Sequence, residues 1–250
     1  AHAALDDWTR QAQPGRSLRV AHNMALYTGK RRTWRLAALY LDRLMNWRFP
    51  ERIRGKMDFL GINYYGAEWI TLRGLDIDPG EEYSEAGRAV HPRGLYLLLK
   101  ESARRFPAVP IIVTENGIAD ATDLLRPAYM LEHLAAVAQA RAEGVPVQGF
   151  IWWTLSDNWE WADGYCPKFG LAAVERQRGL KRVPRPSYAL FSELARTREL
   201  TTSRRERAWR SVAENVGKPR PFCRAADGIT ALGTAATRPV SANDWRFRAD

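Results

Sequence analysis

The chain alternates between short apolar runs and longer stretches in which apolar residues recur every three or four positions. A short apolar run bounded by turn residues is typical of a strand, and the longer spacing is typical of an amphipathic helix. The short runs predict strands at 17–27, 57–65, 110–115 and 147–155, with 169–175 as a candidate for a short fifth. The longer stretches predict helices at 34–47, 92–106, 124–143 and 185–197.

Strand and helix follow one another along the chain, with no Gly/Ser linker and no internal repeat between them. This order is typical of an α/β protein with a parallel sheet or barrel. We therefore expect residues 1–197 to form one α/β domain. The tail at 198–250 is rich in Pro, Gly, Ala and Thr, and we expect an extension that is helical near 204–216 and irregular beyond it.

Composition and charge narrow the class of protein. The 250 residues carry a net charge of +10, but the middle of the chain is its least basic part. Arginines scattered over helices are more often a solvated surface than a nucleic-acid site, so we expect no nucleic-acid partner. No apolar run approaches the roughly 18 residues of a membrane span, and no membrane partner is expected either.

The chain contains two cysteines, Cys166 and Cys223. They are too few for a disulfide framework and lack the spacing of metal ligands. The first residues also lack the charged-then-apolar plan of a signal peptide. These features favour a reducing, cytoplasmic setting, and they predict neither a metal site nor a cofactor.

Polar and aromatic side chains gather where the predicted strands end. Glu115 closes one apolar run, and the segments at 22–23, 63–65 and 152–161 add His, Asn, Tyr, Trp, Asp and Glu. In a parallel barrel the carboxyl ends of the strands form the active face. Carboxylates and amides bind hydroxyl groups, and indole rings stack on the C–H faces of sugars. The pattern therefore favours a pocket for a polar, ring-shaped ligand such as a sugar.

Several segments carry a resemblance to a known family. Three of them resemble, in order and spacing, the signature segments of glycoside hydrolase family 1, the β-glucosidase family: DFLGINYY (58–65), PIIVTENGIAD (110–120) and WWTLSDNWEWADGYCPKFGL (152–171). Two further segments resemble that family's fifth barrel strand and its last helix: RVAHNMALY (19–27) and RVPRPSYALFSEL (182–194).

The resemblance covers roughly residues 10–197 and implies strands 5–8, with their helices, of a (β/α)8 barrel. It also implies a retaining mechanism in which Glu115 is the nucleophile and Tyr65 holds its carboxylate ionised and oriented. Asn63 would lie near the leaving group. The residues that would bind the sugar ring are Trp153, Glu160, Trp161 and Phe169. The acidic Glu160 favours an unphosphorylated β-glycoside or oligosaccharide as the substrate.

Plainer interpretations of the same residues stay open. Glu115 also fits a salt-bridged strand end, Glu160 a surface carboxylate, and Asn63 a turn cap. Tyr65, Trp153 and Phe169 also fit ordinary core residues, because aromatic side chains are common in protein cores. For His22 and Asn23, a structural role is at least as good an interpretation as a substrate contact.

A retaining glycosidase needs a second carboxylate, about 5–5.5 Å from the nucleophile, as its acid/base. The family supplies this group from an Asn-Glu-Pro segment, which does not occur in this sequence. We therefore expect the isolated chain to be inactive on ordinary glycosides and to need a partner, either an N-terminal half-barrel or a further copy of itself. The alternative is a non-catalytic carbohydrate-binding remnant of the same family.

Overall fold

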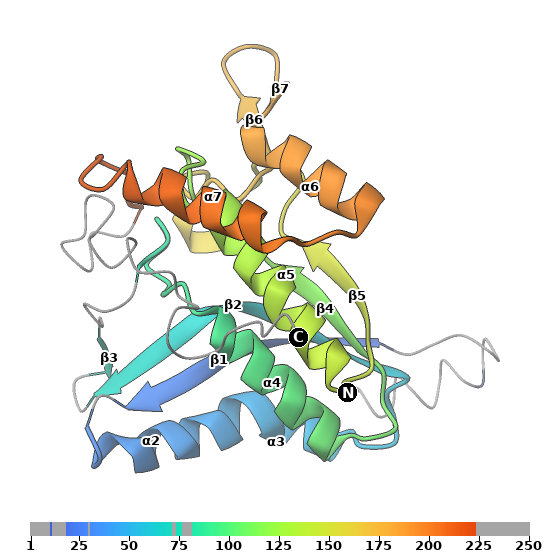
Figure 1. The fold of residues 1–250 in the computed structure, drawn as a ribbon. Helices are drawn as coiled ribbons and strands as arrows, with labels where there is room; N and C mark the ends of the chain where they lie inside the picture. The colour runs from blue at the N-terminus through green and yellow to red at the C-terminus, as the bar shows by residue number, and fades with distance from the viewer. Residues whose placement is uncertain (1–10, 12–18, 30, 72–73, 77–81, 224–250) are drawn as a thin grey trace.

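The computed structural model describes residues 11, 19–29, 31–71, 74–76 and 82–223, and a parallel sheet lies at its centre (Figure 1). Its strands, in spatial order, are β1 (Arg19–Gly29), β2 (Phe59–Thr71), β4 (Ile111–Asn116) and β5 (Val147–Trp152). Each neighbouring pair is parallel. The short β3 (Gly74–Asp76) pairs with β2 in the antiparallel sense. The carboxyl ends of the parallel strands therefore share one edge of the sheet.

Helices connect the parallel strands, as the geometry of a parallel pair requires. The helical segments are α2 (Trp34–Leu41), the π-helical η1 (Asp42–Trp47), α3 (Arg48–Arg52), α4 (Pro92–Arg105), α5 (Arg126–Ala142), the 3-10 turn η2 (Trp161–Asp163), α6 (Pro186–Thr197) and α7 (Thr202–Ala213). A hairpin of β6 (Ala172–Glu175) and β7 (Lys181–Pro184) stands apart from the sheet (Figure 1). Within the described residues, no helix combines the length and the apolar character needed to cross a membrane.

The main hydrophobic core lies between the sheet and the helices α4 and α5. The strands contribute residues that are almost fully buried, among them Leu60, Ile62, Ile111 and Val113. Helix α4 faces them with Leu95, Leu98 and Leu99, whose spacing of three and four residues places them on one side of the helix. This packing holds the carboxyl edge of the sheet in place.

A second core joins α5 to the segment that follows α6. Glu132 on α5 is fully buried and accepts hydrogen bonds from Arg205 at 2.9 and 2.7 Å and from the indole nitrogen of Trp209 at 3.0 Å. Trp209 and Val212 are themselves buried in this core. Helix α7, which belongs to the tail predicted as an extension, therefore packs against the α/β domain.

Two predicted elements differ from the structure. The helix predicted at 34–47 changes to π-helix at Asp42, whose carboxylate accepts from Asn46 at 2.7 Å and from Trp47 at 2.8 Å. The strand predicted at 169–175 forms as β6, but it pairs with β7 in the hairpin and not with the sheet. The π-helix depends on side-chain contacts within the predicted helix. The pairing of β6 depends on β7, which lies outside the predicted strand.

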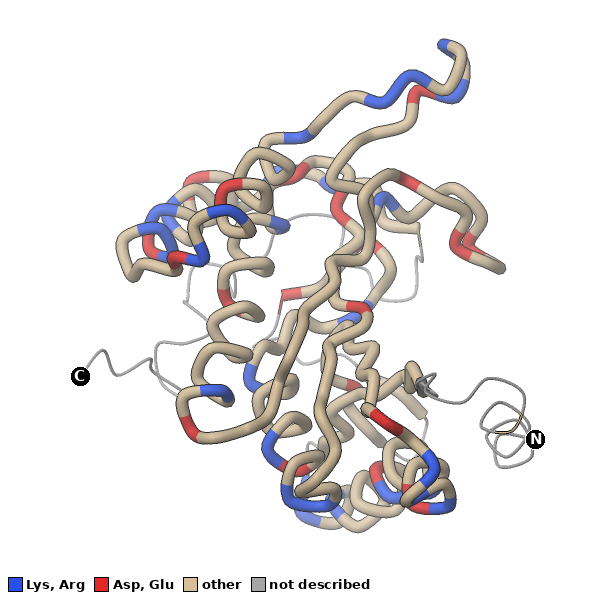
Figure 2. The backbone as a smooth tube through the Cα atoms, turned by 90° about the vertical axis from the view of Figure 1, so that its right-hand side faces the viewer, with Lys and Arg blue, Asp and Glu red and all other residues tan. Residues whose placement is uncertain are grey.

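Charged residues lie mainly on helices and loops, away from the strands of the sheet. Figure 2 shows Lys and Arg on several separate surfaces, including the tip of the β6–β7 hairpin and the helices at the opposite end of the molecule. The basic excess is therefore spread over the described surface.

Candidate active site

A cavity of about 440 Å³ opens where the parallel strands end. It brings together all seven site residues that the sequence nominates. Its lining consists of Asn23, Asn63, Tyr65, Ala86, Arg88, Glu115, Trp153, Glu160, Trp161, Ala162, Asp163, Pro167 and Phe169.

Glu115 stands near the end of β4, beside the middle of β2, which continues to Thr71. In the strand register it lies opposite Asn63, after an irregularity at Ile62. The hydroxyl of Tyr65 donates a hydrogen bond to Oε2 of Glu115 at 2.5 Å. Burial and this hydrogen bond raise the pKa of Tyr65, so its phenol remains a donor. A donor held on one carboxylate oxygen fixes the orientation of the group and leaves the other oxygen for chemistry.

The two residues after Glu115 fix the end of the strand. The buried Asn116 donates from Nδ2 to the carbonyl of Tyr64 at 2.8 Å and to the hydroxyl of Tyr129 at 2.9 Å. At Gly117, a Cβ atom would lie 1.8 Å from the carbonyl oxygen of Trp153. Only glycine allows so close an approach of two backbones, which explains the residue order Glu-Asn-Gly in physical terms.

One wall of the cavity is aromatic and acidic. The indole nitrogen of Trp153 donates to Oε1 of Glu160 at 3.1 Å, so the two side chains are held together. Phe169 is 6% exposed and meets the ring of Tyr65 edge-on, with ring centroids 5.8 Å apart. Trp161 is 86% exposed and stands at the rim. This wall offers apolar faces beside a carboxylate, the combination that binds a sugar ring and its hydroxyl groups.

The loop that carries Glu160 is tied down at its base. Asp157 accepts from both terminal nitrogens of Arg185, each at 3.0 Å, and from the backbone of Gly170 at 3.0 Å. A bidentate pair of this kind fixes direction as well as distance. Asp157 and Gly170, at the two ends of this loop, are therefore hydrogen-bonded to each other, and Arg185 holds Asp157 in place.

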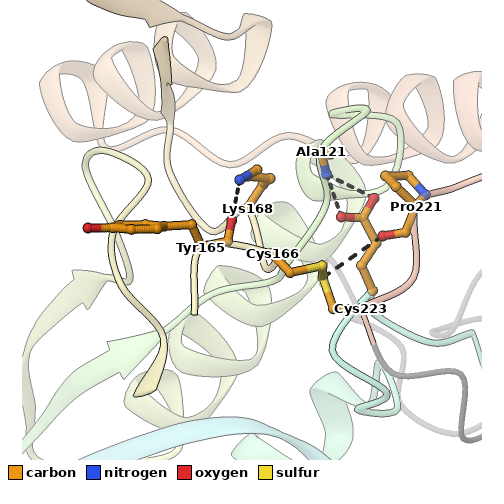
Figure 3. Close-up of a disulfide and its surroundings, with 7 residues drawn as sticks. Ala121, Tyr165, Cys166, Lys168, Pro221 and Cys223 are labelled. Atoms are coloured by element: carbon orange, nitrogen blue, oxygen red, sulfur yellow. Dashed lines mark hydrogen bonds between the residues drawn. A yellow bond between two sulfur atoms is a disulfide. The ribbon is translucent and has the colours of Figure 1, made fainter. Parts of the chain in front are cut away.

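A disulfide between Cys166 and Cys223 ties the same loop to the end of the described tail (Figure 3). The two cysteines are 57 residues apart in the sequence. The sequence predicted no disulfide framework and favoured a reducing setting, and this single bond counts against that setting. The sequence offered no pairing signal, because it is the packing of the tail against the site loop that brings the two sulfur atoms together.

Five other residues that line the cavity were not nominated by the sequence: Ala86, Arg88, Ala162, Asp163 and Pro167. They lie in loops or in η2, where no strand-end pattern points to them. Of the two weak candidates on β1, Asn23 lines the cavity, whereas His22 bonds the carbonyl of Met45 at 2.8 Å. Among the described residues, no three His, Cys, Asp or Glu side chains are grouped so that they could hold a metal ion.

A carboxylate with a phenol donor, beside a tryptophan–glutamate pair at the carboxyl edge of a parallel sheet, defines a glycosidase-like site on a barrel-type fold. The model of glycosyl hydrolase family 1 matches residues 48–200, and the chain belongs to this family. The predicted family membership is thereby confirmed.

Plant proteins are among the relatives. Galactolipid galactosyltransferase SFR2, chloroplastic, from Arabidopsis thaliana is 48% identical over 210 residues, which cover 80% of this chain and 34% of that protein. Beta-glucosidase-like SFR2, chloroplastic, from Oryza sativa subsp. japonica is 44% identical over 238 residues, which cover 91% of this chain and 37% of that protein. The chain thus spans about a third of the length of these relatives. Both are named as chloroplastic, which gives no support to the cytoplasmic prediction.

Solved structures agree on the fold. The hyperthermophilic β-glucosidase from Pyrococcus furiosus matches with a TM-score of 0.69 at 32% identity, over 78% of this chain and 44% of that one. The family 1 β-glucosidase from Thermotoga maritima matches with a TM-score of 0.73 at 22% identity, over 80% and 55%. These matches confirm the predicted barrel-type α/β fold, of which this chain supplies about half.

Proposed function

We propose that the chain carries the nucleophile-bearing part of a retaining β-glycosidase site. The main support is the 2.5 Å hydrogen bond from Tyr65 to Glu115, within the cavity that also contains the pair Trp153 and Glu160. The phenol leaves one oxygen of Glu115 available for attack. The indole and the second carboxylate suit the face and the hydroxyl groups of a sugar.

The reaction has two steps. In the first, the carboxylate of Glu115 attacks the anomeric carbon, the bond to the glycosidic oxygen breaks, and that oxygen takes a proton from an acid. In the second, water attacks the same carbon, its proton goes to the now basic partner, and Glu115 is released. Asn63 lines the cavity and supports this chemistry, since its Oδ1 is occupied by the hydroxyl of Thr114 at 2.6 Å and its amide group keeps N–H donors for a substrate.

The sequence contains no Asn-Glu-Pro segment, from which the family supplies the proton donor. Glu160 is held against Trp153 and is suited to the sugar hydroxyls, so we propose that the acid/base carboxylate comes from residues outside 1–250. General acid assistance contributes ~10²–10⁴ in rate. The chain by itself should therefore be slow on ordinary glycosides but able to form the covalent intermediate from a substrate whose leaving group needs no proton.

A 2-deoxy-2-fluoro β-glycoside with a dinitrophenolate leaving group tests this proposal. We expect a covalent label on Glu115, located by peptide mass spectrometry, and no label in Glu115→Gln. Glu206→Gln, which removes an exposed carboxylate of α7, is the matched control and should label like the parent. Sugar binding without any label would overturn the proposal and favour the non-catalytic remnant.

Transfer to a sugar of a galactolipid is a second candidate function. It is favoured by the 48% identity to a relative that is named a galactolipid galactosyltransferase. The same glycosyl-enzyme would form, and a sugar hydroxyl would replace water in the second step. Labelled protein incubated with galactolipid should then lose its label faster than protein in buffer alone, whereas equal rates would speak for hydrolysis.

A further inference from the structure

Arg88 lines the cavity but takes no part in the two-step reaction at Glu115. Its guanidinium carbon lies 5.6 Å from the centroid of the Tyr65 ring. One terminal nitrogen lies 3.5 Å from Oε1 of Glu68, a long contact that engages that nitrogen weakly. The side chain is 40% exposed. With respect to the part of the chain that the structure describes, most of its five N–H donors therefore remain available to a molecule in the cavity.

The backbone around Arg88 is fixed. The amide of Arg88 donates to Oγ of Ser84 at 3.1 Å, and the amide of Ser84 donates to the carbonyl of Arg88 at 2.9 Å. The next residue, Ala89, forms a bridge to Ala67 of β2. A Cβ atom at Gly66 would lie 2.0 Å from the carbonyl oxygen of Ala89, so the segment lies directly on β2. The guanidinium is thus attached to an ordered turn.

The position of Arg88 along β2 indicates which part of a substrate it meets. Its partner Glu68 follows Tyr65 by three residues, roughly 10 Å along the strand toward the carboxyl end. The guanidinium contacts both of these side chains, so it reaches from Tyr65 toward the carboxyl end of β2. Because Arg88 and Glu115 line the same cavity, a leaving group directed from Glu115 toward this end of β2 would meet Arg88.

The charge of the cavity restricts what Arg88 can bind. Among the described lining residues, Arg88 is the one cation, and Glu115, Glu160 and Asp163 are acidic. An anionic ligand would meet a net negative surface. A neutral group with neighbouring hydroxyls would instead find a planar donor fork that reaches two oxygen atoms at once.

We propose that Arg88 is a specificity residue, which binds adjacent hydroxyl groups of the sugar or polyol that leaves from, or accepts, the glycosyl group. The inference rests on the proposed function, because it needs a donor sugar bound at Glu115. It predicts selection for a hydroxylated leaving group or acceptor over a plain alkyl one.

Equilibrium binding tests the proposal without requiring turnover. In the Glu115→Gln background, dissociation constants are measured by calorimetry for a β-linked disaccharide and for the matching methyl β-glycoside. We expect Arg88→Met to weaken disaccharide binding roughly tenfold, the effect of about one charge-assisted hydrogen bond, and to leave the methyl glycoside within about twofold. Arg88→Lys should lose most of the same selectivity, because it keeps the charge but not the fork.

Control measurements distinguish the proposed role of Arg88 from the proposed function of Glu115. Arg182→Met removes an exposed arginine of β7 and should change neither constant. Unchanged disaccharide binding in Arg88→Met, or an equal loss for both ligands, would overturn the role of Arg88 while labelling of Glu115 still stands. If the parent binds neither ligand and takes no label, the proposed function fails and the Arg88 inference fails with it.

Discussion

Helices α5 and α2 have similar patterns of apolar residues in the sequence, but α5 is largely buried in the fold and α2 is largely exposed. On α5 even the charged Glu132 is fully buried. On α2 the buried residue is Ala38, whereas Leu36, Leu39 and Tyr40 are 75%, 64% and 67% exposed. Both stretches have apolar residues at helical spacing, so the spacing alone does not distinguish a covered helix from an uncovered one.

The difference lies in what surrounds each helix. Helix α5 lies against β5 and is flanked by α4, α6 and α7. Helix α2 lies beside β1, which has a hydrogen-bonded neighbour on one side only within the described chain. An apolar stripe therefore shows that a helix has a face to cover, while the elements that cover it come from distant parts of the sequence.

The largest expected effect comes from breaking the contact between α5 and α7. Glu132→Ala leaves Arg205 buried without its bidentate partner, and removal of one member of a buried ion pair costs about 3–5 kcal/mol. Urea unfolding followed by circular dichroism measures the change. The double variant Glu132→Leu with Arg205→Leu is the control and should lose much less. A loss below about 1 kcal/mol in the single variant would show that α7 does not cover α5 in solution.

A core substitution on α5 should come next. Leu131 is 1% exposed and belongs to the core shared with α6 and α7. Leu131→Ala removes buried methyl groups and leaves a cavity, so we expect the free energy of unfolding to fall by about 2–5 kcal/mol. The measurement is again urea unfolding. A cost of a few tenths of a kcal/mol would mean that the site is open to solvent.

The disulfide links the tail after α7 to the loop that carries Glu160. Cys223→Ser should lower the free energy of unfolding by about 2–4 kcal/mol, because it frees a loop closed over 57 residues. Reduction of the parent with dithiothreitol should have the same effect, and reduction should leave the variant unchanged. Equal stability of the oxidised parent and the variant would count against the bond.

The burial of His133 on α5 predicts that the free energy of unfolding depends on pH. His133 is fully buried, its Nδ1 bonds the carbonyl of Tyr129 at 2.8 Å, and burial lowers its pKa to about 3. The unfolded chain binds a proton at this side chain near pH 6.5, and the folded chain does not. Stability attributable to His133 therefore falls as the pH drops below 6.5, by about 2–3 kcal/mol at pH 4.5.

The measurement is the difference in unfolding free energy between the parent and His133→Phe at several pH values. Burial raises the pKa of Glu85 to about 7, and its contribution has the opposite sign, being lost as the pH rises. That contribution is common to both proteins and cancels in the difference. A difference that stays constant between pH 7 and 4.5 would refute the assignment.

The strand and helix pattern and the main site residues were within reach of the sequence for a physical reason. Buried parallel strands are apolar runs, and β4 carries Glu115 at the end of such a run. All seven nominated residues line one cavity, although their catalytic roles remain predictions. The position of Arg88, the pairing of Cys166 with Cys223 and the covering of α5 by α7 were out of reach. Each depends on contacts between segments far apart in the chain, which periodicity does not encode.

The smallest expected effect on stability belongs to the uncovered helix. Leu39→Lys on α2 should change the free energy of unfolding by less than about 0.5 kcal/mol, because the side chain is 64% exposed. It should lower self-association in sedimentation velocity, since Leu36, Leu39 and Tyr40 form an exposed apolar face. Leu75→Lys, at a leucine of β3 that is 65% exposed, is the matched control and should leave association unchanged. A large loss of stability in Leu39→Lys would show that this face is covered in solution, and the contrast with α5 would then disappear.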